Sequence, residues 1–354
     1  VYYVIILAVL GYVAYAVVEE RGYQKTAAVT GAVDVKVKGQ GFTLAEGSLS
    51  EVGRVYDAVD LTELETAGFF IATAVAETAQ NRSTCAGSYA GGGSLDERCG
   101  GPAPPANNCS EGRITWNGVQ TGACLEVAGG AHFCEVEGWC PGEGSPAGGK
   151  MKTVNNTEHF TAFVRVNAKF PGFTDSHGQT IRWNNVDRGD APIEGYNLFS
   201  VGEILDMAGV NLDDVRETGC DIVVTWHFDC DLDSETIENC SPMPLQAARI
   251  DTVDSPVSRG YNFRRAVTTA DGKERLLTKL SGVRIRMQLT GNARRFDLVE
   301  LLTHVGSGLA LLGVATLCTD ALLLYVLPEK RVYGQLKYEA HEAHELNEPL
   351  YAPP

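Results

Sequence analysis

Residues 301–327 read LLTHVGSGLALLGVATLCTDALLLYVL, an apolar run long enough to cross a lipid bilayer as a single helix. A plain membrane anchor does not need the Gly, Ser and Thr residues that gather in this run. Polar groups at membrane depth are costly unless they face water or a partner, yet His304 and Asp320 are both present. The stretch therefore predicts a membrane helix, and its polar residues leave open whether it only anchors the protein or also lines a path through the membrane.

A second apolar run opens the chain, because residues 1–18, VYYVIILAVLGYVAYAVV, contain no charge. Lipid cannot satisfy open backbone groups, so both runs are predicted to be helices. The first run lacks the basic leader and cleavage site of a signal peptide, and we expect a membrane span that is truncated at its N-terminus. We therefore predict a first transmembrane helix at 1–18, an extracellular domain at 19–297, a second transmembrane helix at 298–327 and a cytoplasmic tail at 328–354.

Basic residues and cysteines set the expected orientation. Lys330, Arg331 and Lys337 follow the second span, which favours the cytosol for that end. Two spans then place both termini in the cytoplasm and the middle of the chain outside the plasma membrane. Nine of the ten cysteines lie in that middle segment, a density typical of an oxidising compartment. Asn81 and Asn155 are the expected glycosylation sites, because the asparagines of the other two sequons directly precede cysteines.

Strand-like patterns dominate the extracellular segment. Residues 32–40, AVDVKVKGQ, place three valines on one face and charged residues on the other, as a half-buried strand does. Strand-like sequence patterns also predict strands at 69–78, 160–167, 221–228 and 283–289. Residues 201–208 are expected to form a short helix. Residues 85–150 are rich in Gly, Pro, Asn and Cys, which is typical of a small disulfide-stapled head subdomain, and their spacing alone leaves the pairing open. The predicted fold is a large β-rich, disulfide-stapled extracellular domain on two membrane helices.

The net charge of −16 argues against a protein whose surface as a whole binds nucleic acid or anionic lipid. An anion site must therefore be a local cluster of basic residues. Candidates are Lys36 and Lys38 on one strand, Arg264 and Arg265 in a second region, and Lys279 ahead of a strand with two arginines. Each of them alone is most often a solvated strand face. Together they supply the several charge-assisted hydrogen bonds that a polyphosphate requires.

The sequence motifs that would indicate an enzyme or a metal site are weak. Residues 144–151, GSPAGGKM, lack the Ser or Thr and the strand–helix setting of a phosphate loop. HEAHE at 341–345 offers two histidines without a third ligand, in a charged tail. The acidic strings at 227–233 and 211–217 offer oxygen ligands for a divalent cation, although acidic loops on an acidic protein are usually just solvated. No cofactor and no enzymatic activity are predicted.

Six motifs then point to one family. They are GYQ (22–24), KVKG (36–39), FCEVEGWCP (133–141), WHFDCDLD (226–233), GYNFR (260–264) and GSGLALLGVAT (306–316). In their order and approximate spacing over nearly the whole chain, the protein resembles the ionotropic purinoceptors, the P2X-type ATP-gated cation channels. The resemblance implies a homotrimer in the lipid bilayer that passes Na⁺, K⁺ and Ca²⁺, with ATP as agonist and divalent cations as candidate modulators.

The resemblance also implies roles for individual residues. It assigns ATP binding between neighbouring subunits to Lys36, Lys38, Thr161, Phe163, Asn262, Phe263, Arg264 and Lys279. Phe163 stands where the family usually packs an aliphatic side chain on the ligand. For the second span, the resemblance implies a closed gate at Leu309 and Ala310, with Ser307 above and Gly313 below. Three copies of that span would place its small residues at helix contacts or along the lumen, namely Gly306, Ser307, Gly308, Ala310 and Gly313.

The same resemblance implies the disulfides Cys85–Cys140, Cys99–Cys124, Cys109–Cys134 and Cys230–Cys240. The family's pair between positions 170 and 219 is missing, and Cys220 is left over, either as a buried inert thiol or as a free reactive one. The expected function is an extracellular-ATP-gated, non-selective cation channel.

Three other interpretations share this topology. An ectonucleotidase would need paired Gly-rich phosphate loops, for which GGGSLDE at 91–97 is too slight. A proton- or peptide-gated trimeric channel would lack the Lys-x-Lys and Asn-Phe-Arg motifs, and a purely structural receptor stalk needs neither.

Overall fold

The structure is a computed structural model, and it describes residues 2–87, 98–100, 109–115, 117–127, 130–143, 147–186, 192–242, 244–251, 260–328, 332 and 334. The residues 91–97 and 341–345 and nearly all of the expected cytoplasmic tail at 328–354 lie outside these ranges. The chain forms two compact units. One consists of residues 1–28, 230–240 and 292–354, and the other of residues 29–229 and 241–291.

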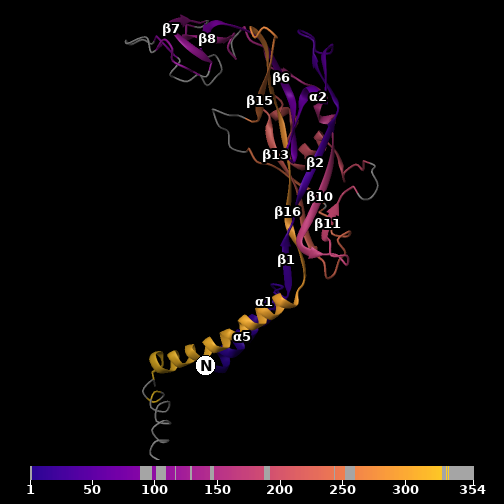
Figure 1. Ribbon diagram of the computed structural model, residues 1–354, viewed down its shortest axis with the longest axis vertical. Coiled ribbons are helices and arrows are strands. Elements are labelled where there is room, and N and C mark those ends of the chain that lie inside the picture. The colour runs from indigo at the N-terminus through magenta and orange to yellow at the C-terminus, as the bar shows by residue number, and fades with distance from the viewer. Residues whose placement is uncertain are drawn as a thin grey trace, which may run out of the picture. The chain divides into compact units, whose positions relative to one another are not determined.

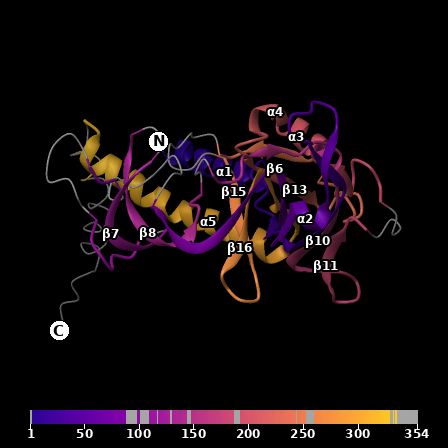
Figure 2. The same cartoon turned by 90° about the horizontal axis from the view of Figure 1, so that it is seen from above.

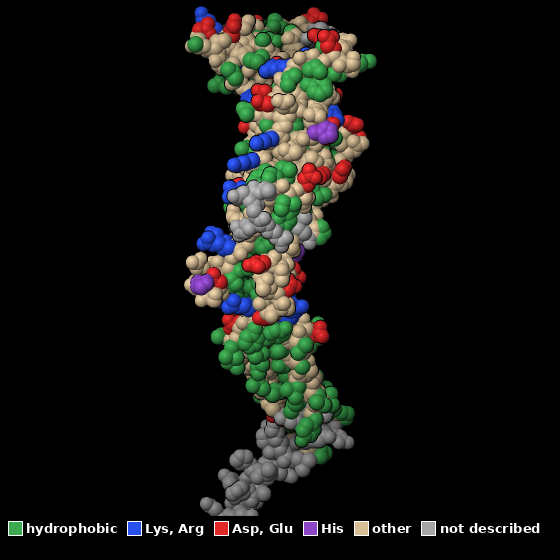
Figure 3. All heavy atoms as spheres, turned by 90° about the vertical axis from the view of Figure 1, so that its right-hand side faces the viewer, with side chains coloured by type: hydrophobic (Ala, Val, Ile, Leu, Met, Phe, Trp, Pro, Cys, Tyr) green, Lys and Arg blue, Asp and Glu red, His purple; other side chains and the backbone are tan. Residues whose placement is uncertain are grey.

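The first unit contains the two apolar helices (Figure 1). They are α1, Tyr2–Val18, and α5, Leu298–Ala321, which continues into the π-helical turn η3, Leu322–Val326. Over the described residues, the segment Leu298–Val326 is the one helix both long and apolar enough to cross a bilayer, and α1 is shorter. Figure 3 shows hydrophobic side chains covering this helical part of the surface.

Small residues set how closely the helices of this unit approach. A Cβ added to Gly308 would overlap the side chain of Val13, so glycine at this position lets α5 pack directly against α1. Gly306 and Gly313 have open space beside them, and the side chains of Leu309 and Ala310 are exposed in the single chain. The expected gate residues are thus not covered by α1.

Strand β1, Gln24–Ala28, pairs antiparallel with the end of β16, Glu274–Phe296, from Gln24↔Phe296 to Ala28↔Asn292. Asp297 then caps α5, since its carboxylate accepts the backbone N–H groups of Val299 at 2.8 Å and Glu300 at 3.3 Å. A loop closed by the Cys230–Cys240 disulfide belongs to the same unit. Strand and helix therefore join without an intervening loop at the second span.

The second unit is built around one long strand pair. β6, Gly68–Ala86, runs antiparallel to β16 from Gly68↔Arg286 to Asn81↔Glu274, and it has neighbours on both sides in a ten-stranded sheet. Residues Phe69 to Ala76 of β6 are buried. The pattern is that of a strand covered on both faces, as its continuous apolar sequence indicates.

The remaining elements complete this sheet, a smaller sheet and a hairpin. The large sheet follows the order β14-β13-β16-β6-β8-β7, with β1 and β15 on β16 and with β5 and β9 on β6. Its other strands are β5, Thr62–Glu65, β7, Gly118–Glu126, β8, His132–Cys140, β9, Lys152–Thr153, β13, Cys220–Asp231, β14, Gln246–Arg249, and β15, Asn262–Thr268. The four-stranded sheet contains β2, Thr30–Lys38, β10, Thr161–Thr174, β11, Thr180–Asn184, and β12, Leu198–Ser200. The hairpin is β3, Gln40–Leu44, with β4, Val52–Asp57.

Short helices connect these strands. They are α2, Ala58–Leu61, the 3₁₀ turn η2, Thr157–His159, α3, Val201–Met207, and α4, Leu212–Val215. Ser200 and Glu203 form a capping box at the start of α3, so the expected helix at 201–208 is confirmed. Each expected strand is also present, and the strands at 160–167, 221–228 and 283–289 extend beyond their predicted bounds.

Four disulfides are present, Cys85–Cys140, Cys99–Cys124, Cys109–Cys134 and Cys230–Cys240, which are the pairs that the resemblance implies. Strands β7 and β8 are paired and lie side by side in Figures 1 and 2. Cys124 of β7 is bonded to Cys99 and Cys134 of β8 to Cys109, and both of these partners lie outside the two strands. The sulfur atoms of Cys99, Cys109 and Cys134 lie close together but are all in disulfides, so they are not free to bind a metal.

Candidate ATP site

The expected ligand residues form two clusters, the first on β2 and β10. The antiparallel register places Thr161 opposite Lys38 and Phe163 opposite Lys36. Both lysines are exposed, and both partners on β10 are half-buried. A Cβ added to Gly39 would overlap the ring of Phe160, so the glycine of the KVKG motif lets the chain leave β2 close beside β10. This first cluster presents two ammonium groups and a hydroxyl on one strand pair.

The second cluster lies on β15 and β16, where Arg264 stands directly opposite Lys279 and Asn262 opposite Ser281. Like charges at directly opposed positions repel. The carboxylate of Glu143 lies between them, because it accepts hydrogen bonds from Nη2 and Nε of Arg264, the former at 2.9 Å, and contacts Lys279 Nζ at 3.0 Å. The second cluster therefore already binds an anionic group, and that group comes from the same chain.

The contacts of Glu143 and Arg264 set the ionisation of these two side chains. Burial alone would raise the pKa of Glu143, but the hydrogen bonds from Arg264 and Lys279 outweigh it and hold the pKa below its usual value. The hydrogen bond between Arg264 and Glu143 also raises the pKa of Arg264. Glu143 is thus a carboxylate at neutral pH, and the cations are satisfied by it.

Aromatic packing holds the start of β15. The ring of Phe263 meets that of Phe70 edge to face, with centroids 4.7 Å apart. Tyr261, the residue before β15, also packs on Phe70, at 5.6 Å, and its hydroxyl donates to Glu65 at 3.3 Å. Phe263 therefore orients the strand that carries Arg264 by packing against the core.

Three arginines of the basic set are engaged elsewhere. Arg284 donates to Glu65 at 2.8 and 2.5 Å, and Arg286 donates to Asp221 at 3.1 and 3.0 Å. Arg265 donates to the backbone carbonyl of Asp60 at 2.8 Å. The contacts of Arg284 and Arg286 join strands of the large sheet, and that of Arg265 joins β15 to α2. The second cluster therefore depends on Arg264 and Lys279.

The two clusters belong to different sheets of the second unit, since β2 and β10 lie in the four-stranded sheet and β15 and β16 in the ten-stranded one. Among the residues that the structure describes, no hydrogen bond or ion pair joins a side chain of the first cluster to one of the second. One chain thus carries two separate basic clusters.

Sequence reasoning missed Glu143. The available signal was an acidic residue three positions after Cys140, at the end of the head subdomain, in an otherwise Gly- and Pro-rich loop.

Burial distinguishes between the two expected states of the unpaired Cys220. This thiol is fully buried, and burial raises its pKa to about 12, which favours the inert state. Of the two expected glycosylation sites, Asn81 is exposed, whereas Asn155 is half-buried with its Nδ2 3.5 Å from the carbonyl oxygen of Phe42.

Known proteins resemble this chain over almost its whole length. It is 31% identical to P2X purinoceptor 4 of Bos taurus, over 96% of this chain and 88% of that protein. A solved invertebrate P2X receptor from the Gulf Coast tick, in the presence of ATP and Zn²⁺, matches 92% of this chain and 100% of its own, at 27% identity and a TM-score of 0.69.

A second solved structure is that of the chicken ATP-gated P2X7 receptor channel with the competitive antagonist TNP-ATP. It matches 92% of this chain and 99% of its own, at 26% identity and a TM-score of 0.65. The model of the ATP P2X receptor family matches residues 1–340. The chain belongs to the ATP P2X receptor family.

Proposed function

We propose that this chain is one subunit of a trimeric cation channel of the plasma membrane that extracellular ATP opens. Its relatives are P2X purinoceptors, and the similar solved structures are of receptors with ATP or TNP-ATP. A member of this receptor family is a ligand-gated channel and not an enzyme, which sets aside the ectonucleotidase. The proton- or peptide-gated channel and the structural stalk are set aside on the same ground.

One observation carries the ligand assignment. Arg264 and Lys279 face each other and are bridged by the carboxylate of Glu143. An arginine fork and a lysine ammonium that hold a carboxylate also suit the oxygens of a phosphate, which carry more charge. The polyphosphate of ATP therefore competes with Glu143 for these two cations.

The first cluster supplies the rest of the proposed site. Lys36 and Lys38 provide further positive charge, and Thr161 and Phe163 lie beside them on the same strand pair, where a nucleoside would pack. Asn262 opens β15 next to Arg264, and Phe263 sets the orientation of that strand. Each site is completed by the first cluster of one subunit and the second cluster of its neighbour.

Closure of the two clusters around ATP acts on the pore through the strands. Lys279 and Phe296 belong to the same strand, β16, and Asp297 caps α5 directly after it. In the pore we assign the closed gate to Leu309 and Ala310, with Ser307 and Gly313 on either side. A constriction lined by leucine can exclude water and ions until the helices separate.

The test is whole-cell current at a negative holding potential while ATP is applied outside cells that express the full chain. We expect an inward cation current that untransfected cells lack. Lys38→Ala and Arg264→Ala should each raise the half-maximal ATP concentration by about tenfold or more, because each removes a charge-assisted contact of about 1.5 to 3 kcal/mol.

Lys169→Ala is the matched control, since Lys169 is an exposed lysine on β10, the strand that pairs with β2, and lies outside the cluster. Its ATP sensitivity should equal that of the unmodified chain. Unchanged ATP sensitivity of both cluster variants, with normal amounts of trimer at the cell surface, would rule out the proposed site.

A further inference from the structure

Gln80, in the middle of the large sheet, is a buried side chain that no role assigned above uses. It lies on β6 and is only 2% exposed. Its Oε1 accepts a hydrogen bond from Arg275 Nε at 2.7 Å, and its Nε2 donates to the carbonyl oxygen of Pro141 at 2.7 Å. Both ends of the carboxamide are thus satisfied, one by β16 and one by the segment that follows β8.

Arg275 strengthens the same junction. It stands directly opposite Gln80 in the β6–β16 register, and its guanidinium lies over the ring of Trp139 with 4.5 Å to the centroid. Trp139 is the penultimate residue of β8. The pair Gln80–Arg275 therefore ties the end of β8 to the strand that carries Lys279.

The backbone between this junction and Glu143 is short. Cys140 is held to β6 by its disulfide with Cys85, and Pro141 is held by Gln80. Gly142 follows, and the space around it is almost empty, with one backbone oxygen 3.8 Å from where its Cβ would be. Glu143 comes next, so the anchored carbonyl of Pro141 is the last fixed point before the carboxylate that bridges Arg264 and Lys279.

We propose that Gln80 is a positioning residue of the ATP site, which holds Glu143 between Arg264 and Lys279 through its hydrogen bond to the Pro141 carbonyl. It thereby sets how strongly the internal carboxylate competes with ATP. The inference rests on the proposed function and assigns Gln80 and Arg275 the regulation of that same site. Neither residue belongs to the two clusters of the proposed site.

The experiment is a double-mutant cycle on the half-maximal ATP concentration in cells that express the full chain. Gln80→Leu removes the side-chain hydrogen bonds to Arg275, Pro141 and Trp139 with little change of volume. It should lower the half-maximal concentration by about threefold, because a partly exposed ion pair is then loosened. Glu143→Gln should lower it at least as much. In the Glu143→Gln background, Gln80→Leu should have no further effect, which a merely structural role would not produce.

Gln120→Leu is the matched control. Gln120 is also a buried glutamine, 1% exposed, but it lies on β7 and its Oε1 accepts from the backbone of Ser110. This variant should leave the half-maximal ATP concentration unchanged. If Gln80→Leu does not reach the cell surface, Arg275→Met takes its place in the cycle, since it removes the Nε donor and keeps an unbranched stem over Trp139.

The outcomes separate this inference from the function beneath it. No ATP current from the unmodified chain at the surface would overturn both. A normal ATP current with no effect of Gln80→Leu, or with the same fold-change whether or not Glu143 is present, would overturn the positioning role alone. A fold-change that disappears in the Glu143→Gln background supports it.

Discussion

At the scale of single residues, the charge of Glu143 determines how the second cluster behaves without ligand. An internal anion bound to Arg264 and Lys279 must leave before a phosphate can take its place. The apparent affinity of a ligand falls with the fraction of sites that are free to bind it. In the proposed site the carboxylate would therefore reduce ATP potency, while it keeps the two opposed cations of β15 and β16 compatible.

Replacing this residue gives the first prediction. Glu143→Gln removes the negative charge and keeps the size, so it should lower the half-maximal ATP concentration by about three- to tenfold, equivalent to about 0.7 to 1.4 kcal/mol. Concentration–response curves of ATP-evoked current measure it. Glu137→Gln, an exposed glutamate of β8, is the control and should have no effect. A half-maximal concentration that stays the same or rises would contradict competition by Glu143.

Cys220 gives a prediction about reactivity. Burial, assisted by the neighbouring Asp251 carboxylate, raises the pKa of this thiol to about 12. At pH 8 only about one molecule in ten thousand is then the reactive thiolate, and that group is buried as well. A membrane-impermeant maleimide should leave Cys220 unmodified in intact cells and modify it after denaturation without reduction, as read by mass spectrometry.

The control for this labelling is Ser50→Cys, which places a thiol in an exposed loop between β3 and β4. That thiol should react within the same exposure. Modification of Cys220 at a comparable rate would mean that its surroundings open in the native receptor, and the inert role would be wrong.

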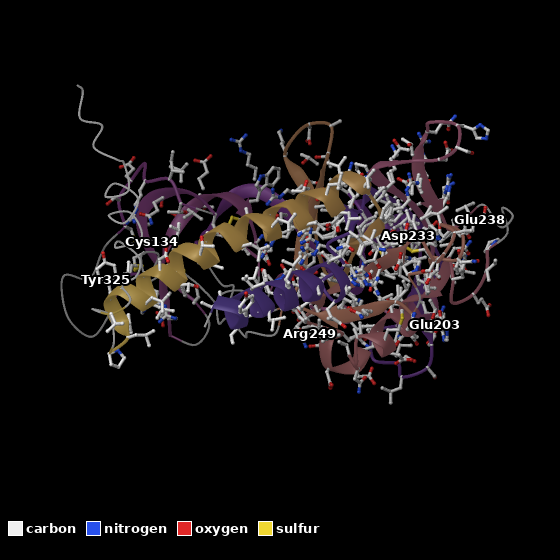
Figure 4. The ribbon with its side chains drawn as sticks, turned by 90° about the horizontal axis from the view of Figure 1, so that it is seen from below. Cys134, Glu203, Asp233, Glu238, Arg249 and Tyr325 are labelled. Carbon is white, nitrogen blue, oxygen red and sulfur yellow. A yellow bond between two sulfur atoms is a disulfide. The ribbon has the colours of Figure 1, made fainter. Side chains whose placement is uncertain are left out.

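At the scale of elements, the loop between Cys230 and Cys240 holds the strand ends next to the membrane helices. Asp233, drawn as sticks in Figure 4, accepts the backbone N–H of Phe296 at 2.8 and 2.9 Å and a hydrogen bond from Gln24 Nε2 at 2.8 Å. Asp231 accepts from Arg21 at 2.9 Å and from the same Gln24 Nε2 at 3.0 Å. The loop thus ties β1, which follows the first helix, to the end of β16, which precedes the second.

Loss of this tie should weaken gating and spare ligand binding. Asp233→Ala removes the acceptor of Phe296 N–H, and we expect the open probability at saturating ATP to fall by about threefold, from a net hydrogen-bond contribution of about 0.5 to 1.5 kcal/mol. Single-channel recording measures it. Glu238→Ala alters an exposed acidic residue of the same loop and serves as the control. Equal open probabilities in the two variants would show that the loop does not couple the strands to the pore.

At the scale of the whole molecule, the sequence predicts the structural elements that depend on local residue patterns. The alternation at 32–40 and the helical segment expected at 201–208 correspond to β2 and α3, because strand and helix periods are local properties. The partners of Arg284 and Arg286 could not be predicted, since Glu65 and Asp221 are 219 and 65 residues away and meet them only through the strand register. Glu143 was missed for the same reason, being 121 residues from Arg264.

The division of the site between two sheets gives the last prediction, which a linked trimer of three subunits in one chain can test. Lys38→Ala damages a first cluster, and Arg264→Ala a second. If each site combines clusters from neighbouring subunits, both changes in one subunit damage two sites. The same changes in two adjacent subunits damage one site in one order and two sites in the other.

A site within one subunit would give a different pattern, because both changes together would then damage one site and either adjacent order would damage two. Half-maximal ATP concentrations of the three linked trimers therefore distinguish the two architectures. We expect one adjacent order to be more sensitive to ATP than both the other order and the subunit with both changes. The most sensitive trimer being the one with both changes in a single subunit would place the complete site within one chain, although its two clusters lie on separate sheets.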